Sequence, residues 1–251
     1  MTNFAKNILL AGLLASVPAW MQAQKKHVNA YFTATEMPDL LRWMPAPPDS
    51  TSSQFAFDVL AHLHGKGQRQ DSVRADIALR DAVYGAKTIV NEFSPIFGLQ
   101  ISPEETPEIY RVLEEGLATC DSICTLPKSY WKRKRPFMAF NEPTLTPKEE
   151  KFLRSNGSYP SGHAILGWAA ALLLTEINPA AQDSLMARGL MFGQSRVIVG
   201  AHWQSDVEMG RLAASAAYAR LHTSERFLEQ MRKARAEFQC KKGNEISAVT
   251  P

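Results

Sequence analysis

The chain has 251 residues, of which 45% are hydrophobic and 21% are charged, so it can bury a large core and lacks the composition of a disordered protein. Its formal net charge is +3 and it has no long basic run, which argues against a nucleic-acid-binding surface. The chain has three cysteines and no Cys-x-x-Cys pair, so a thiol-redox or zinc-ribbon protein is a weak interpretation. In an oxidising compartment, two of the cysteines could form a disulfide.

Residues 1–23 are expected to be an export signal that is removed from the mature protein. Lys6 is the only charged side chain, the apolar stretch Ile8–Val17 follows it, and small residues place the cleavage after Ala19 or Ala23. This stretch is shorter than the ~20 residues that a membrane span needs, although an uncleaved anchor helix is the alternative. We therefore expect a periplasmic or secreted protein with no stable membrane association once the signal is removed.

Residues 24–240 are expected to form one compact all-α domain that opens with an irregular arm. The arm covers residues 28–50, where four prolines interrupt any regular helix. From Ser53 onward apolar residues recur at helical spacing, and we find no alternating strand pattern and no internal repeat. The polar residues 241–251 are expected to form a mobile tail.

Capping residues and apolar patterns predict where the helices begin and end. Ser102, followed by Pro103 and two acids, is typical of a helix start, and Thr146 followed by Pro147 is another. Ala164–Leu174 is apolar on nearly every face, which predicts a helix buried on most sides. Further helices are expected from Ser53, over 71–86, up to Val199 after a break at Asn178-Pro179, over 203–221 and over 225–238.

The first polar cluster that could carry chemistry runs from Lys128 to Arg135 and Pro136, and alone it is best interpreted as a solvated basic stretch. The second is Gly157-Ser-Tyr-Pro-Ser-Gly-His163, directly before the buried helix. Ser161 and Gly162 stand where that helix begins, and the free N–H groups and positive dipole of a helix N-terminus attract anions. A simple turn with a helix cap is the other interpretation.

The third polar cluster combines Arg196 with His202 and Asp206. A helix that starts near His202 would put Asp206 one turn further along on the same face. A carboxylate in that position can orient a histidine and stabilise its charged form. The alternative interpretation is a core histidine with an ordinary partner.

Together the three clusters supply the parts that phosphoryl transfer needs. The two histidines allow one nucleophile and one general acid. Lys128, Arg135 and Arg196 can neutralise a phosphate dianion, and arginine can bind it with two parallel hydrogen bonds. Phosphoryl transfer requires mainly in-line positioning and neutralisation of the phosphate oxygens, and these residues offer both.

The ordered pattern Lys-x6-Arg-Pro, Pro-Ser-Gly-His and Ser-Arg-x5-His-x3-Asp resembles the signature of the type 2 phosphatidic acid phosphatase (PAP2) superfamily, which includes the vanadium-dependent haloperoxidases. Within it, Gly157–His163 and Gln194–Asp206 are similar to motifs of the bacterial class A non-specific acid phosphatases. The likeness covers roughly residues 30–240. It implies a single compact helical domain of the PAP2/haloperoxidase type.

The resemblance also implies a role for each matching residue. His202 would attack phosphorus and become a phosphohistidine, Asp206 would orient it, and His163 would protonate the leaving alcohol and then activate water. No metal or other cofactor is needed in this scheme. An acidic optimum is expected because His163 must be protonated to act as an acid, and the pKa of histidine is typically ~6.5. The residues expected to hold the phosphate are Lys128, Arg135, Ser161, Gly162 and Arg196.

The sequence departs from the class A pattern in two places. Ala164 stands where a threonine is usual, so a polar contact near the pocket is expected to be missing. The segment before Lys128 is longer than usual, and a secondary carboxylate of the pocket could therefore be Glu114, Glu115 or Asp121.

We therefore expect an exported acid phosphatase that hydrolyses a broad range of small phosphate monoesters. The alternatives are a vanadate-dependent haloperoxidase, a soluble lipid phosphatase or pyrophosphatase of the same superfamily, and an inactive anion-binding module. The resemblance suggests a homodimer or a larger homo-oligomer. His62 and His64 could suggest a metal site, but no partner ligands accompany them in the sequence, so a surface or packing role is preferred.

Overall fold

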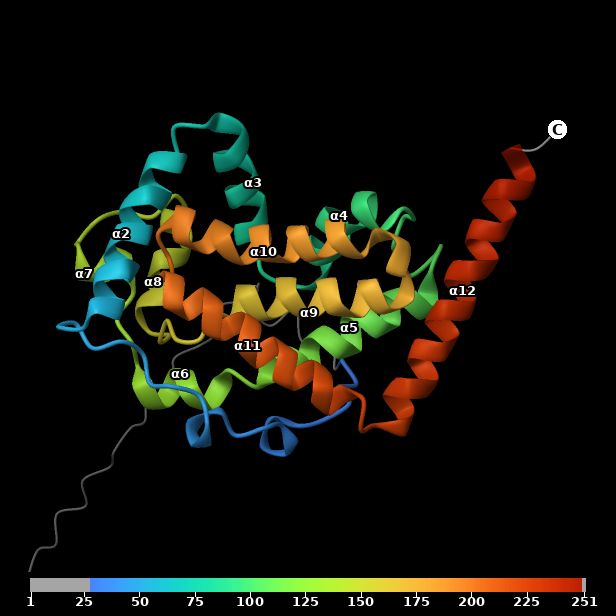
Figure 1. Ribbon diagram of the computed structural model, residues 1–251, viewed down its shortest axis with the longest axis horizontal. Coiled ribbons are helices and arrows are strands. Elements are labelled where there is room, and N and C mark those ends of the chain that lie inside the picture. The colour runs from blue at the N-terminus through green and yellow to red at the C-terminus, as the bar shows by residue number, and fades with distance from the viewer. Residues whose placement is uncertain (1–27, 250–251) are drawn as a thin grey trace, which may run out of the picture.

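The computed structural model describes residues 28–249, with side chains through residue 243, and every regular element in this part is a helix (Figure 1). The predicted all-α class is therefore confirmed. The expected signal peptide, residues 1–23, and its cleavage sites lie outside the described residues. Between residues 28 and 249, no helix is both long enough and apolar enough to pass through a membrane.

The N-terminal arm consists of two short 3-10 helices joined by loops, η1 (Ala34–Glu36) and η2 (Leu40–Arg42). Asp39 caps η2, because its side chain accepts a hydrogen bond from Leu41 N at 3.0 Å. Leu40 is buried in the core of the domain. The arm is thus irregular, as expected, but it is attached to the domain by apolar packing.

The body of the domain is a set of α-helices whose boundaries mostly follow the predicted ones. A short 3-10 helix precedes α8 at the predicted start Thr146-Pro147, and another follows the predicted break at Asn178. The elements are α2 (Ser53–Gln68), α3 (Ser72–Ala82), α4 (Ala86–Phe97), α5 (Pro107–Ser122), α6 (Thr125–Trp131), α7 (Pro136–Ala139), η3 (Pro147–Glu149), α8 (Glu150–Arg154), α9 (Gly162–Ile177), η4 (Pro179–Ala181), α10 (Gln182–Val199), α11 (Gln204–Leu221) and α12 (Glu225–Val249).

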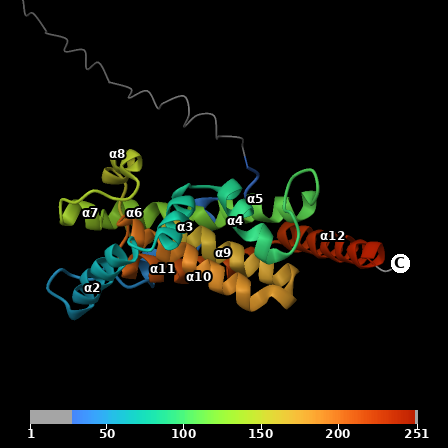
Figure 2. The ribbon, with the colours of Figure 1, turned by 90° about the horizontal axis from the view of Figure 1, so that it is seen from above.

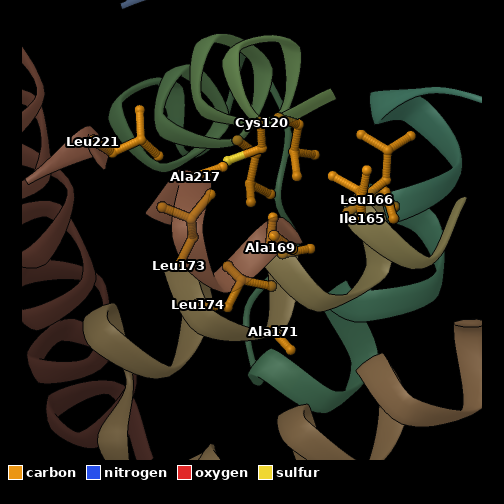
Figure 3. Close-up of a cluster of buried hydrophobic side chains, with 14 of the residues drawn as sticks. Cys120, Ile165, Leu166, Ala169, Ala171, Leu173, Leu174, Ala217 and Leu221 are labelled. Carbon is orange, nitrogen blue, oxygen red and sulfur yellow. The ribbon is translucent and has the colours of Figure 1, made fainter. Parts of the chain in front are cut away.

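Helix α9 lies at the centre of the fold because its sequence is apolar on nearly all sides. Figure 1 shows it between α10 and α11, and Figure 2 shows α5 as part of a layer along one side of α9 and α10. Cys120, Leu173 and Ala217 belong to one apolar cluster built from α5, α9 and α11 (Figure 3). The predicted buried helix is confirmed, and this packing holds its N-terminal residue, Gly162, in place.

Two glycines allow α9 and α10 to approach each other closely. A Cβ atom added at Gly167 would lie 2.7 Å from Phe192 Cβ, and one added at Gly189 would lie 2.8 Å from Ala171 Cβ. Any larger side chain at either position would push the helices apart. Because α9 carries His163 and α10 carries Arg196, the two glycines also set the distance between these site residues.

The predicted helix start at Ser102 is wrong. Ser102 instead closes a turn, because its carbonyl oxygen accepts a hydrogen bond from Thr106 N at 3.0 Å. Helix α5 begins at Pro107, so the same proline-and-acid signal occurs twice in this segment. The carboxylate of Glu237 on α12 accepts the first N–H groups of α5, and this long-range contact selects the second start.

Other boundaries differ from the prediction as well. Helix α3 ends at Ala82, and the turn Val83–Gly85, in which Gly85 has a φ of 126°, separates it from α4. The polar residues expected as a tail continue α12 as far as Val249. Leu60, part of the apolar spacing that predicted α2, is 61% exposed, because only one side of α2 packs against α10 and α11.

Two of the three cysteines lie in the segment before Lys128 that is longer than usual for class A acid phosphatases, at the place where this segment packs into the core. Cys120 and Cys124 are buried and carry free thiols. Burial raises the pKa of each thiol to about 12. Both therefore stay protonated and serve as small apolar side chains rather than as nucleophiles.

Gly167→Ala should destabilise the fold, because the new methyl group would overlap Phe192 between two packed helices. We expect the free energy of unfolding to fall by about 1–3 kcal/mol, measured by urea denaturation. Gly67→Ala on α2 is the matched control, since a Cβ there meets nothing within 4 Å and alanine favours a helix by up to ~1 kcal/mol. Equal stability of the Gly167→Ala variant and the unchanged protein would contradict the close approach of α9 and α10.

Candidate active site

The residues predicted to form the site come together where α10 ends and α9 and α11 begin (Figure 1). Ser161 N donates a hydrogen bond to Asp206 O at 2.9 Å, which joins the start of α9 to the first turn of α11. The set that meets here is Lys128 on α6, Arg135 before α7, Ser161, Gly162 and His163 at α9, Arg196 on α10, and His202 and Asp206 at α11.

His202 is held in one tautomer by its two neighbours. Arg135 Nη1 lies 2.9 Å from Nε2, and because a guanidinium only donates hydrogen bonds, Nε2 must be the acceptor. Nδ1, which lies 3.3 Å from Asp206 Oδ2, therefore carries the proton. Burial, and after it the charges of Arg135 and Lys128, push the pKa of His202 well below its ordinary value. The ring is thus neutral, and its Nε2 lone pair points toward the cations.

Asp206 reaches His202 by a geometry that differs from the prediction. Helix α11 starts at Gln204, one residue after the predicted start, so His202 precedes the helix instead of sharing one of its faces with Asp206. Asp206 Oδ2 accepts a hydrogen bond from Trp203 N at 2.8 Å and thereby caps α11. The carboxylate turns back toward the helix start because it is a capping group, and this places it beside His202.

A second carboxylate, Asp58 on α2, supports Asp206 through Arg133. Arg133 Nη1 donates to Asp206 Oδ1 at 2.6 Å, and its Nη2 donates to Asp58 Oδ2 at 2.7 Å. Ser205 donates to Asp58 through its N–H at 2.8 Å and its hydroxyl at 2.6 Å. Asp58, Ser205 and Asp206 are buried and the Arg133 side chain is 8% exposed, so this network determines the orientation of Asp206.

The sequence prediction missed Arg133 and Asp58. Arg133 lay within the first polar cluster, where it looked like one more solvated cation. Asp58 is on α2, far from the other site residues in the sequence, and no local pattern connects it with them. The only available signal was the unusual position of an aspartate on the buried side of an amphipathic helix.

Lys128 and Arg135 share one backbone carbonyl. Gly157 O accepts a hydrogen bond from Lys128 Nζ at 2.9 Å and a longer one from Arg135 Nη2 at 3.3 Å. Burial lowers the pKa of Lys128 to about 8 and that of Arg135 to about 10. Because a neutral carbonyl offsets neither charge, the pair favours an anion nearby.

Arg196 is fully buried and poorly paired. Its three guanidinium nitrogens have no hydrogen-bond partner among the described residues. The Oε2 atom of Glu149 lies 3.5 Å from Nη2, which is longer than the 2.7–3.2 Å of a normal N–H···O bond. Burying a charge without partners is costly, so these donors indicate a site built to receive an anionic group.

The N-terminus of α9 supplies further donors at the same place. Ser161 is its N-cap, and the Ser161 hydroxyl oxygen accepts a hydrogen bond from Ala164 N at 3.3 Å. Gly162 follows as the first helical residue, and its N–H has no partner within the helix. The positive end of this helix therefore faces the region that Lys128 and Arg196 surround.

Of the three carboxylates considered for the pocket, Asp121 is the one beside the site. A Cβ atom at Gly162 would lie 3.3 Å from Asp121 Oδ1, and the hydroxyl of Tyr84 donates a hydrogen bond to the same oxygen. Burial raises the pKa of Asp121. Glu115 instead forms an ion pair with Arg226 at 2.6 Å.

His163 is oriented by the backbone of α3. Its Nε2 lies 2.9 Å from Ala82 O, and because a carbonyl only accepts, Nε2 carries a proton and Nδ1 is the nitrogen left for a substrate. Burial, followed by the charge of Arg196, pushes the pKa of His163 well below its ordinary value. A bound anion would counteract that charge and make protonation of Nδ1 easier.

A buried ion-pair network ties the end of α3 to α10. Asp81, next to Ala82, accepts hydrogen bonds from Ser195 Oγ at 2.6 Å and from Arg188 Nη1 at 3.1 Å. Ser195 directly precedes Arg196 in α10. One network therefore joins the end of α3, which orients His163, to the turn of α10 that carries Arg196.

Ala164 and His62, which the sequence also singled out, both pack against apolar or aromatic side chains. Ala164 is buried in an apolar cluster with Val197 and Val207. His62 stacks on Phe140 with ring centroids 5.0 Å apart. Within the described residues, no group of three or more His, Cys, Asp or Glu side chains could hold a metal ion.

The chain is similar to known proteins over most of its length. Residues 112–227 match the model of the PAP2 superfamily. The chain is 38% identical to a non-specific acid phosphatase of Providencia stuartii over 227 residues, which is 90% of this chain and 91% of that protein. It is 40% identical to a non-specific acid phosphatase of Salmonella typhimurium over 78% of each chain, and 32% identical to an acid phosphatase of Zymomonas mobilis over 95% of this chain and 89% of that protein.

The His202 ring should remain neutral and protonated at Nδ1 throughout the range in which an ordinary histidine titrates. Burial and neighbouring cations disfavour the imidazolium, so the ring gains a proton only at a pH well below ~6.5. Nitrogen-15 NMR of histidine-labelled protein without phosphate measures both the tautomer and the midpoint. A midpoint for His202 at or above the ~6.5 of a free histidine would contradict the assignment.

Asp58→Ala should be strongly destabilising, because it leaves Arg133 half paired and Ser205 N–H without its acceptor in a buried place. Breaking a buried ion pair by removing one partner costs about 3–5 kcal/mol, which urea denaturation can measure. Glu229→Ala is the control, since it removes an exposed ion pair in which the Glu229 side chain is 46% exposed and the Arg232 side chain is 68% exposed. Such pairs contribute at most ~1 kcal/mol to stability. Similar losses in the two variants would show that the Asp58 network contributes little.

Proposed function

We propose that this chain, which belongs to the PAP2 superfamily and is an acid phosphatase, hydrolyses its substrates through a phosphohistidine formed on His202. The observation that carries this proposal is the pairing of a neutral imidazole with a buried guanidinium that has only a distant carboxylate beside it. His202 Nε2 has its lone pair directed at Arg135, and the three guanidinium nitrogens of Arg196 have no hydrogen-bond partner in the part of the chain that the structure describes. A phosphate group among them would satisfy the cations and present its phosphorus to Nε2.

In the first step, the Nε2 lone pair of His202 would form a bond to phosphorus while the bond from phosphorus to the ester oxygen breaks. Arg135 would exchange its hydrogen bond to Nε2 for one to a phosphate oxygen, and Lys128, Arg196 and the N-terminus of α9 would hold the other oxygens. The ring becomes positively charged when it is phosphorylated. Asp206, which accepts a hydrogen bond from the Nδ1–H group, would stabilise that charge.

His163 would act first as an acid toward the leaving group and then as a base toward water. Its protonated Nδ1 would give a proton to the ester oxygen as the alcohol departs, which leaves His163 neutral. Nδ1 would then take a proton from a water molecule whose oxygen attacks phosphorus, and the phosphorus–nitrogen bond would break to restore His202. Burial lowers the pKa of His163, so His163 gains its proton only at a lower pH than an ordinary histidine does. Activity that needs protonated His163 should therefore increase as the pH falls, in agreement with an acid phosphatase.

We also propose export and a broad range of substrates. Export is supported by the signal-like sequence of residues 1–23, which lies outside the described residues. Breadth is supported by the site itself, because Lys128, Arg135, Arg196 and the N-terminus of α9 would bind phosphate oxygens, which all phosphate monoesters share. Assembly into a homodimer or larger oligomer stays a proposal that rests on the resemblance.

His202→Ala should reduce turnover of p-nitrophenyl phosphate by at least about a thousandfold, because the residue that accepts the phosphoryl group is lost. Release of p-nitrophenol at acidic pH measures this. His222→Ala is the matched control, since His222 bonds Glu176 and the Tyr218 carbonyl at α11 and should keep near-normal turnover. A folded His202→Ala variant with near-normal turnover would reject the phosphohistidine mechanism, and bromide oxidation with vanadate and peroxide would instead favour the haloperoxidase alternative.

A further inference from the structure

The turn between α3 and α4 brings an aromatic side chain against His163. The Tyr84 ring packs edge-on to the His163 ring, with centroids 4.7 Å apart and an angle of 74° between the planes. This turn directly follows Ala82, whose carbonyl orients His163. Tyr84 therefore lies next to the group proposed to protonate the leaving oxygen.

The ring of Tyr84 is held in a defined place. Its hydroxyl donates a hydrogen bond to Asp121, and a Cβ atom at Gly162 would lie 3.0 Å from this hydroxyl oxygen, so the phenol end rests on the start of α9. Burial at that end, followed by the charge of Asp121, holds the pKa of Tyr84 well above its ordinary value, so the hydroxyl stays a donor. Two contacts, one at each end of the residue, thus fix the orientation of the ring.

The outer part of Tyr84 remains open to solvent. The residue is 45% exposed and its neighbour Val83 is 59% exposed, whereas His202 and Arg196 are buried. Tyr84 therefore presents apolar surface to solvent directly beside His163. An alcohol that receives its proton from His163 would lie within reach of this ring.

We propose that Tyr84 determines specificity by favouring phosphate monoesters whose leaving group is a flat aromatic ring. This inference rests on the proposed function, because His163 marks the side on which the alcohol leaves. Aromatic rings gain more from contact with each other than their buried area accounts for, whereas a saturated ring of similar size gains only the area term. The preference is one of degree, since contact with an aromatic ring favours aromatic groups without excluding alkyl groups.

The test compares phenyl phosphate with cyclohexyl phosphate, which have leaving groups of similar size. For Tyr84→Leu, we expect the ratio of kcat/KM for phenyl phosphate to kcat/KM for cyclohexyl phosphate to fall by roughly threefold to tenfold relative to the unchanged protein. Dividing by the unchanged protein removes the difference in intrinsic reactivity between the two esters. Tyr84→Phe keeps the ring and should keep the ratio, even if loss of the bond to Asp121 lowers both values.

Tyr130→Leu is the matched control, because Tyr130 is 68% exposed on α6 and packs against Trp131 rather than against a site residue. It should leave the ratio unchanged. An equal loss on both esters in Tyr84→Leu would overturn the inference and assign Tyr84 a purely structural role. A ratio that falls as far in Tyr84→Phe as in Tyr84→Leu would also overturn it, since the hydroxyl would then be the selective group. Failure of the proposed function is distinguishable, because it would show as normal turnover in His202→Ala.

Discussion

The rest of the site depends on three cations, two fully buried and one part-buried, that surround one neutral imidazole. Among the described residues, Lys128, Arg135 and Arg196 meet backbone carbonyls, His202 and one distant carboxylate rather than closely paired anions. Such an arrangement is costly in the absence of a negative ligand. It also keeps His202 neutral, because each cation disfavours a further positive charge nearby. Affinity for an anion and availability of a nucleophilic lone pair therefore have one electrostatic cause.

The domain offsets this cost by rigid support from several helices. The α9 helix is enclosed by α5, α10 and α11, so its N-terminus is held at a constant position next to the cations. Two ion-pair networks then orient the histidines. Asp58 and Arg133 support Asp206 behind His202, and Asp81 ties the carbonyl that orients His163 to the helix of Arg196. Both networks connect α2 or α3 with elements far away in the sequence.

Much of the fold and of the candidate site could be predicted from local patterns. The continuous apolar run of α9 indicated a central helix, and proline or serine at helix starts gave several boundaries correctly. Local signals failed where they were repeated or incomplete. Ser102 and Thr106 both precede a proline with an acid after it, and only the contact with Glu237 on α12 distinguishes them. The spacing of His202 and Asp206 was informative, but a capping bond rather than a shared helix face brings them together.

The sequence by itself determined the all-α class, the central helix and the types of residue available for phosphate chemistry, because periodicity, capping and side-chain chemistry are local properties. Only the tertiary structure decided which groups act on one another. Asp121 rather than Glu115 faces α9, Arg133 supports Asp206 instead of facing solvent, and Tyr84 reaches His163 from another helix pair. These contacts join residues widely separated along the chain, and their energies depend on burial, which no local pattern specifies.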